Sequence, residues 1–138
     1  MNVITVGTFE ILHYGHIKLF DRCLDLAGDG LFTIGLNTDE FIEKYKGFKP
    51  VMNYGEREKA LEYFSDNIIA NSQKSGGIKD ILNDIDLIVI GSDWARKDYL
   101  SQIGLDWDWL DERGIGICYL NYTHGISTTE IKKRICKK

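Results

Sequence analysis

Proline, cysteine and histidine are scarce in this 138-residue chain, which contains one proline, three cysteines and three histidines. The cysteines, Cys23, Cys118 and Cys136, are odd in number, widely spaced and form no C-x-x-C pair. This pattern excludes a disulfide framework and a cysteine-based zinc site, and it indicates reduced thiols in the cytosol. The single proline, Pro50, lies in a loop-like stretch and divides no domains.

Long apolar runs and a strong positive charge are also missing. No stretch approaches the roughly 20 apolar residues that a membrane span requires. The N-terminus has no cationic leader before an apolar core, so we expect a cytoplasmic protein without membrane contact. The net charge of −4 gives no long-range attraction to nucleic acid. The basic C-terminal run "KKRICKK" fits the polar face and last turn of a terminal helix.

What the chain does contain is an alternation of short apolar runs with helical patterns, which is typical of a parallel α/β sheet. The length suits one domain covering residues 1–138. We predict a Rossmann-like, open, doubly wound sheet of about five parallel strands with helices on both faces. The candidate strands cover residues 2–6, 31–36, 67–70, 85–90 and 116–120.

Helices are predicted between these strands from apolar spacing and capping residues. The first covers residues 14–27 and is ended by Gly28. A second helix is expected after Asn53, with Glu56 as its capping partner, and a last one after Ser127, with Glu130 as its partner. Between them we expect a short helix around "IKDILND" and another over "WDWLDER", which Gly114 ends.

The junction between the first strand and the first helix reads "GTFEILHYGH", with His13 and His16 three residues apart. Gly7 allows a tight exit from the strand, and Gly15 leaves the helix start uncrowded. Free backbone N–H groups at a helix start attract anions, and the imidazoles add donors, so we predict a phosphate site here. The alternative is that both histidines are ordinary surface or capping residues.

Two other strand ends of the predicted sheet carry unusual residues, namely "GSDW" after the fourth strand and "NYTHGISTT" after the fifth. Ser127, Thr128 and Thr129 would begin the last helix, where hydroxyl and N–H groups can hold phosphates. Simple helix capping by Ser127 is the competing explanation, and the two are compatible. The crevice of a doubly wound sheet lies at these strand ends.

The segments "GTFEILHYGH", "NTDEF", "KYK", "YGERE", "GSDWARK" and "GISTTEI" resemble, in order, the HxGH nucleotidyltransferase superfamily and, within it, the cytidylyltransferases, most closely the small glycerol-3-phosphate cytidylyltransferases. The resemblance implies transfer of CMP from CTP to a small phosphorylated alcohol with release of pyrophosphate. It also implies a homodimer. The triphosphate needs a counter-cation, so we expect Mg²⁺ held by substrate and water, with no metal-binding side chains.

Lys44 and Lys46 are predicted to lie in a loop after a short helix. The resemblance assigns site residues by their matching positions. Catalytic roles fall on His13, His16 and Lys44. Acceptor binding falls on Lys46, Arg57 and Tyr122. Nucleotide binding falls on Gly7, Thr8, Phe9, Gly15, Gly91, Asp93, Trp94, Thr123, Gly125, Ile126, Ser127, Thr128 and Thr129. Plain packing is an equal alternative for Trp94.

Some positions depart from the family pattern. Glu10 stands where the family commonly has aspartate, Tyr122 where it often has arginine, and a second basic residue is missing near Ser65. Tyr122 can donate one hydrogen bond but carries no charge, although a protonated His124 would restore some. Two alternatives therefore stay open: adenylyl transfer to a cofactor or sugar phosphate, and a nucleotide-binding module without turnover.

Overall fold

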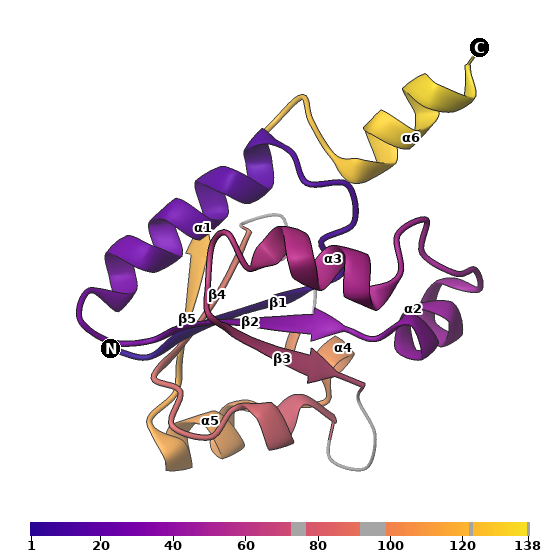
Figure 1. The fold of residues 1–138 in the computed structure, drawn as a ribbon. Helices are drawn as coiled ribbons and strands as arrows, with labels where there is room; N and C mark the ends of the chain where they lie inside the picture. Colours follow the sequence, from indigo (N-terminus) through magenta and orange to yellow (C-terminus); the bar gives the residue numbers. More distant parts are fainter. Residues whose placement is uncertain (73–76, 92–98, 122, 138) are drawn as a thin grey trace.

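A single parallel sheet forms the centre of the protein, as the alternating pattern predicts. The computed structural model describes residues 1–72, 77–91, 99–121 and 123–137. The sheet has five strands in the order β3-β2-β1-β4-β5, and every pair of neighbours is parallel (Figure 1). The strands are β1 (Val3–Gly7), β2 (Phe32–Asn37), β3 (Asn67–Asn71), β4 (Leu87–Gly91) and β5 (Gly116–Leu120).

Helices cover both faces of this sheet, so the doubly wound prediction is confirmed. Figure 1 shows α1 and α3 on one face, and α4 and α5 on the other. The predicted start and end of the first helix and the Asn53–Glu56 capping box are confirmed. The helical segments are α1 (Tyr14–Ala27), α2 (Asp39–Lys46), α3 (Tyr54–Leu61), the 3₁₀ helix η1 (Gly77–Ile81), α4 (Tyr99–Ile103), α5 (Trp107–Arg113) and α6 (Thr128–Cys136).

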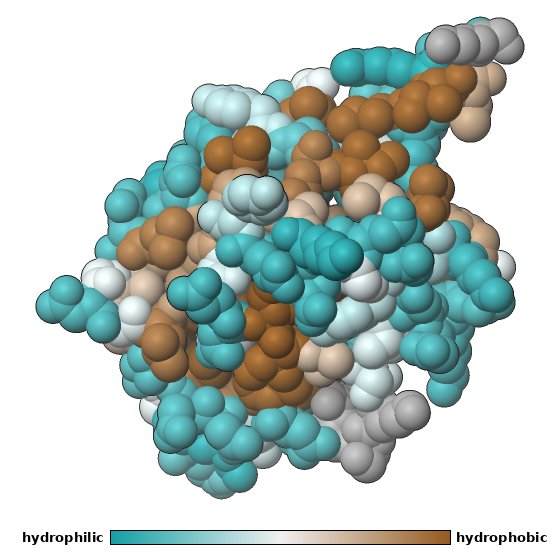
Figure 2. Space-filling model, in the orientation of Figure 1, coloured by the Kyte–Doolittle hydropathy of each residue, from teal (hydrophilic) through white to brown (hydrophobic). Residues whose placement is uncertain are grey.

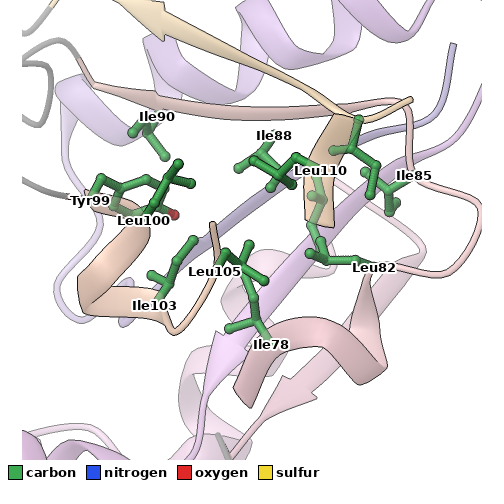
Figure 3. Close-up of a cluster of buried hydrophobic side chains, with 12 residues drawn as sticks. Ile78, Leu82, Ile85, Ile88, Ile90, Tyr99, Leu100, Ile103, Leu105 and Leu110 are labelled. Atoms are coloured by element: carbon green, nitrogen blue, oxygen red, sulfur yellow. The ribbon is translucent and has the colours of Figure 1, made fainter. Parts of the chain in front are cut away.

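Successive strand residues face opposite cores because side chains alternate along a strand. In β4, Val89 packs with Phe20 and Leu61 in the core beneath α1 and α3. Its neighbours Ile88 and Ile90 pack in the other core, beneath η1, α4 and α5 (Figure 3). Burial on both faces fixes the strands firmly, and their C-terminal ends become a rigid platform.

Helix α6 takes no part in either core. None of its residues is buried, and it extends away from the sheet (Figure 1). Figure 2 shows hydrophobic side chains along one side of this projecting helix; Ile135 is 58% exposed. The helix is attached near its start, where the Thr128 hydroxyl donates to the Glu10 carbonyl oxygen (2.9 Å) and Lys132 pairs with the Glu10 carboxylate.

The prediction that Lys44 and Lys46 lie in a loop is wrong, because both residues lie in the last turn of α2. Thr38 caps this helix by accepting from the Phe41 N–H (3.2 Å), and Gly47 ends it with φ +83°. Lysines in a last turn interact favourably with the helix dipole. The helix of eight residues therefore has its own start and stop signals.

Candidate active site

A cavity of about 580 Å³ opens at the C-terminal ends of the strands. It lies where the chain order of the sheet reverses on either side of β1, the usual ligand position in a doubly wound fold. Most of the predicted site residues come together here. Those that line the cavity are Gly7, Thr8, Phe9, His13, Gly15, His16, Lys46, Gly91, Thr123, Ile126, Ser127 and Thr128.

His13 and His16 lie against each other at the start of α1, with ring centroids 3.9 Å apart. The Nδ1 atom of His13 accepts from the Gly15 N–H (3.0 Å), and the His16 Nδ1 accepts from the His13 N–H (3.2 Å). A neutral imidazole carries its proton on the other nitrogen, so Nε2 is the donor in both rings. The capping explanation is therefore correct, and it leaves one N–H on each ring for a ligand.

Partial burial disfavours the charged form of both imidazoles. It lowers the pKa of His13, and burial together with the neighbouring His13 lowers the pKa of His16 to about 4. An anion in the cavity would raise both pKa values by favouring the charged form. Because both Nδ1 atoms accept hydrogen bonds in this state, each ring offers a phosphate an Nε2–H donor.

The backbone of this turn is unusual, which explains its two glycines. A Cβ atom on Gly15 would lie 2.9 Å from Cε1 of His13, and one on Gly7 would lie 3.0 Å from Cζ of Phe9. Phe9 and Ile11 have positive φ angles of 48° and 49°, a region that side chains rarely adopt. Such strain is commonly retained at functional sites, where the surrounding structure holds it in place.

Glu10 lies between the two strained residues and joins three segments of the chain. Its carboxylate is 3% exposed, and it accepts from the Val51 and Met52 N–H groups and pairs with Lys132. Burial alone would raise the pKa of Glu10, but Lys132 and the Val51 N–H outweigh it and hold the pKa below its ordinary value. The charged carboxylate therefore ties the first turn of the site to α6 and to the loop after α2.

The start of α6 forms a second wall of the cavity. Ser127 caps the helix by accepting from the Glu130 N–H (3.1 Å), and the backbone N–H groups of this first turn provide an anion-binding position. The Thr128–Glu10 hydrogen bond holds this turn beside the α1 start, although the two residues are 118 positions apart. Two helix starts thus line one cavity.

Of the two predicted lysines, Lys46 rather than Lys44 lines the cavity. Burial and the nearby Lys132 lower the pKa of Lys46, while Glu10 acts in the opposite direction. Residues two apart on a helix point in different directions. Placing Lys44 in the catalytic group is therefore not supported by this geometry.

Arg57 is 0% exposed, and its guanidinium is engaged by the protein itself. It donates to the carbonyl oxygens of Met52 (3.0 Å), Thr8 (2.9 Å) and Asn37 (2.8 Å), and to Asp39 Oδ1 (2.6 Å). These contacts fasten the ends of β1 and β2 to α3. The geometry gives Arg57 a positioning role in place of the predicted contact with the acceptor.

The remaining predicted residues fall into two groups. Gly125 and Thr129 lie beside the cavity-lining residues Ile126 to Thr128 in sequence but do not line the cavity themselves. Asp93, Trp94 and Tyr122 lie outside the residues that the structure describes.

Sequence reasoning missed several side chains of the cavity wall. Asn37 and Asn71 end β2 and β3, a position that alone would have suggested them. Phe41 and Tyr45 lie one turn apart on α2 with stacked rings, 5.9 Å between centroids. No sequence signal separates these two from ordinary helix residues.

Comparisons with known proteins identify the family of the chain. The chain matches the family model described as cytidylyltransferase-like over residues 4–134. It is 42% identical to the glycerol-3-phosphate cytidylyltransferase of Bacillus spizizenii, covering 95% of this chain and 94% of the relative. It is 36% identical to the enzyme of that name from Staphylococcus aureus, covering 99% of this chain and 96% of the relative.

Among solved structures, a lipopolysaccharide core biosynthesis protein from Thermoplasma volcanium has a TM-score of 0.65 at 21% identity, covering 89% of this chain and 96% of that chain. At this identity the likeness concerns the fold alone. The family model and the relatives, which extend over nearly the whole sequence, show that the chain belongs to the cytidylyltransferase-like family.

Proposed function

We propose that this protein transfers CMP from CTP to glycerol 3-phosphate and releases pyrophosphate. The observation that carries the proposal is the pair of helix starts, at His13 and at Ser127, that line one cavity. Each offers N–H donors to a triphosphate, and together they suit a chain of phosphates. The relatives' names supply the nucleotide and the acceptor.

In the proposed reaction, an oxygen of the acceptor phosphate forms a bond to the α-phosphorus of CTP. The bond from that phosphorus to the bridging oxygen breaks, and pyrophosphate leaves with the electron pair. The attacking phosphate is already an anion, so the reaction needs positioning and charge stabilisation more than a strong base. The Nε2–H groups of His13 and His16 donate to phosphate oxygens as negative charge builds on the leaving group.

Lys46 supplies positive charge from the end of α2, and Ser127 and Thr128 hold the outer phosphates through backbone N–H groups. We propose Mg²⁺ as the counter-ion of the triphosphate. Within residues 1–72, 77–91, 99–121 and 123–137, no three His, Cys, Asp or Glu side chains gather to hold a metal ion. Phosphate oxygens and water would therefore be its ligands, and the ion would neutralise charge on the triphosphate.

Pyrophosphate release tests the proposal. The protein is incubated with Mg²⁺, glycerol 3-phosphate and each nucleoside triphosphate in turn, and release is expected with CTP. Release with ATP and another acceptor, but not with CTP, would favour adenylyl transfer. Nucleotide binding without release under every condition would indicate a binding module.

Three variants test the site. His16→Ala should lower kcat by about 10²- to 10³-fold, the usual effect of losing one preorganised donor. Lys46→Ala should also lower kcat, whereas Lys44→Ala, on the same helix but outside the cavity wall, is the matched control. Equal effects of the two lysine changes would contradict the assignment.

We also propose a cytoplasmic homodimer. All three cysteines are free, which suits a reducing compartment. No described helix is long and apolar enough to cross a membrane.

The dimer is supported by exposed apolar side chains, which favour contact with a second copy. They are Phe48, Val51 and Ile135, which are 54%, 72% and 58% exposed. Sedimentation equilibrium should give twice the 15.8 kDa chain mass; the mass of one chain would contradict the dimer.

A further inference from the structure

Helix α6 supplies one wall of the cavity although it lies outside both hydrophobic cores. None of its nine residues is buried, and Figure 1 shows its start beside the segment between β1 and α1, with the rest of the helix projecting away. A helix of this length is marginally stable in water without tertiary packing. The position of the Ser127–Thr128 turn therefore depends on the contacts that fasten the first turns of α6.

Lys132 provides the ionic part of that attachment. Its ammonium group pairs with the carboxylate of Glu10 and lies 5.6 Å from the centroid of the Phe48 ring. The Lys132 side chain is 28% exposed and that of Glu10 is 3% exposed, so salt screens this pair less than a surface pair. The Val51 and Met52 N–H groups donate to the same carboxylate, which fixes its position independently of the lysine.

The ion pair and a hydrogen bond join α6 to Glu10 at two points. The Thr128 hydroxyl donates to the Glu10 carbonyl oxygen (2.9 Å), and Lys132, one turn further along the helix, pairs with the carboxylate. Residues four apart lie on one face of a helix, so the two attachments together set the direction of the helix axis. Without the lysine, the helix can turn about the Thr128 contact, and the N–H groups of the Ser127–Thr128 turn lose their fixed direction.

We propose that Lys132 is a positioning residue, which strengthens binding of the outer phosphates of the nucleoside triphosphate by fixing the α6 start through Glu10. This inference rests on the proposed function, since it concerns the turn that holds those phosphates. Lys132 is not among the described residues that line the cavity, so it acts through the helix and not by contact with the substrate. Its removal should weaken the binding of a triphosphate much more than that of a monophosphate.

The test measures the binding of CTP and CMP by isothermal titration calorimetry in the presence of Mg²⁺. The two nucleotides differ only in the outer phosphates, so the ratio of their Kd values reports on the α6 start. Lys132→Met removes the ion pair but keeps an apolar side chain beside the Phe48 ring. It should raise the Kd for CTP about tenfold and that for CMP less than about twofold. Lys132→Arg, which can still pair with the Glu10 carboxylate, should bind CTP within about threefold of the wild type.

Lys133→Met is the matched control, because Lys133 is the next residue of α6, is exposed and carries the same charge. It should leave both Kd values within about twofold of the wild type, since salt screens an exposed charge. Equal effects of the two methionine variants would overturn the proposal, because they would show a general attraction of anions by α6. An unchanged ratio of Kd values in Lys132→Met would also overturn it. Lys132→Gln, which also lacks the charge, replaces the methionine variant under the same criterion if that variant does not fold.

Inorganic triphosphate separates this inference from the proposed function, because it has no nucleoside and its binding needs no turnover. Weaker binding of triphosphate by Lys132→Met than by the wild type and Lys133→Met supports the positioning role even if CTP is not the nucleotide. A wild type that releases pyrophosphate from CTP but binds CTP no more tightly than CMP contradicts the inference while the proposed function stands. Absence of binding of all three ligands by the wild type contradicts both.

Discussion

The half-buried His16 imidazole should make the stability of the protein depend on pH in the acid range. Its pKa falls from 6.5 in the unfolded chain to about 4 in the folded protein. Between these values the unfolded chain binds the extra proton, so the free energy of unfolding decreases as pH falls below 6.5. Proton linkage then lowers the free energy of unfolding by about 2 kcal/mol at pH 5, and by roughly 3 kcal/mol once pH is well below 4. Above the unfolded pKa this penalty is absent.

Urea unfolding of the wild type and of His16→Asn at pH 7.5 and pH 5 measures this effect. Asparagine cannot take up a proton here, but its oxygen can still accept from the His13 N–H. Other titrating groups contribute nearly equally to both proteins and cancel in the difference. The wild type should lose about 2 kcal/mol relative to the variant on acidification. An equal difference between the two proteins at both pH values would refute the assignment of a buried, neutral His16.

Three further outcomes follow from the contacts. Arg57→Met should lower the free energy of unfolding by about 3 kcal/mol, because Asp39 and the carbonyl oxygens bound by Arg57 lose their donor; a loss below about 1 kcal/mol in urea titrations would contradict this. Ser127→Ala should cost about 1 kcal/mol through the lost cap, measured by the same titration, and an unchanged midpoint would argue against the cap. In thiol labelling of the native protein, exposed Cys136 should react at once, whereas Cys23, whose pKa burial raises to about 12, should react only on unfolding; equal rates would refute its burial.

The sequence predicts the frame of this protein because its signals are local. Apolar runs mark the strands, and Gly28, Asn53 and Gly114 mark helix boundaries through the φ angles and caps that these residues favour. The turn after β1 was recognisable as a candidate site for the same reason, since Gly7 to His16 is one continuous stretch. Local signals of this kind depend little on the rest of the fold.

The contacts that the sequence does not predict join distant segments. Arg57 seemed suited to a ligand because a cation opposes the dipole near a helix start, but its partners lie up to 49 positions away. Glu10 looked like a minor change from aspartate, yet it joins α6 to the loop after α2. Asn71 had no motif around it, and only the β2–β3 register places it beside Asn37. Packing decides each of these roles.

The measurement that tests the central claim most directly is ³¹P NMR of the reaction with CTP, glycerol 3-phosphate and Mg²⁺. The proposed function combines two helix starts around one cavity with the substrates named by the relatives, and it predicts that the protein joins CMP to the acceptor phosphate. The spectrum should show a new diphosphate diester, CDP-glycerol, growing in step with pyrophosphate, and His16→Ala should form it about 10²- to 10³-fold more slowly. Formation of the product at the wild-type rate by His16→Ala, or no product from the wild type, would contradict the account.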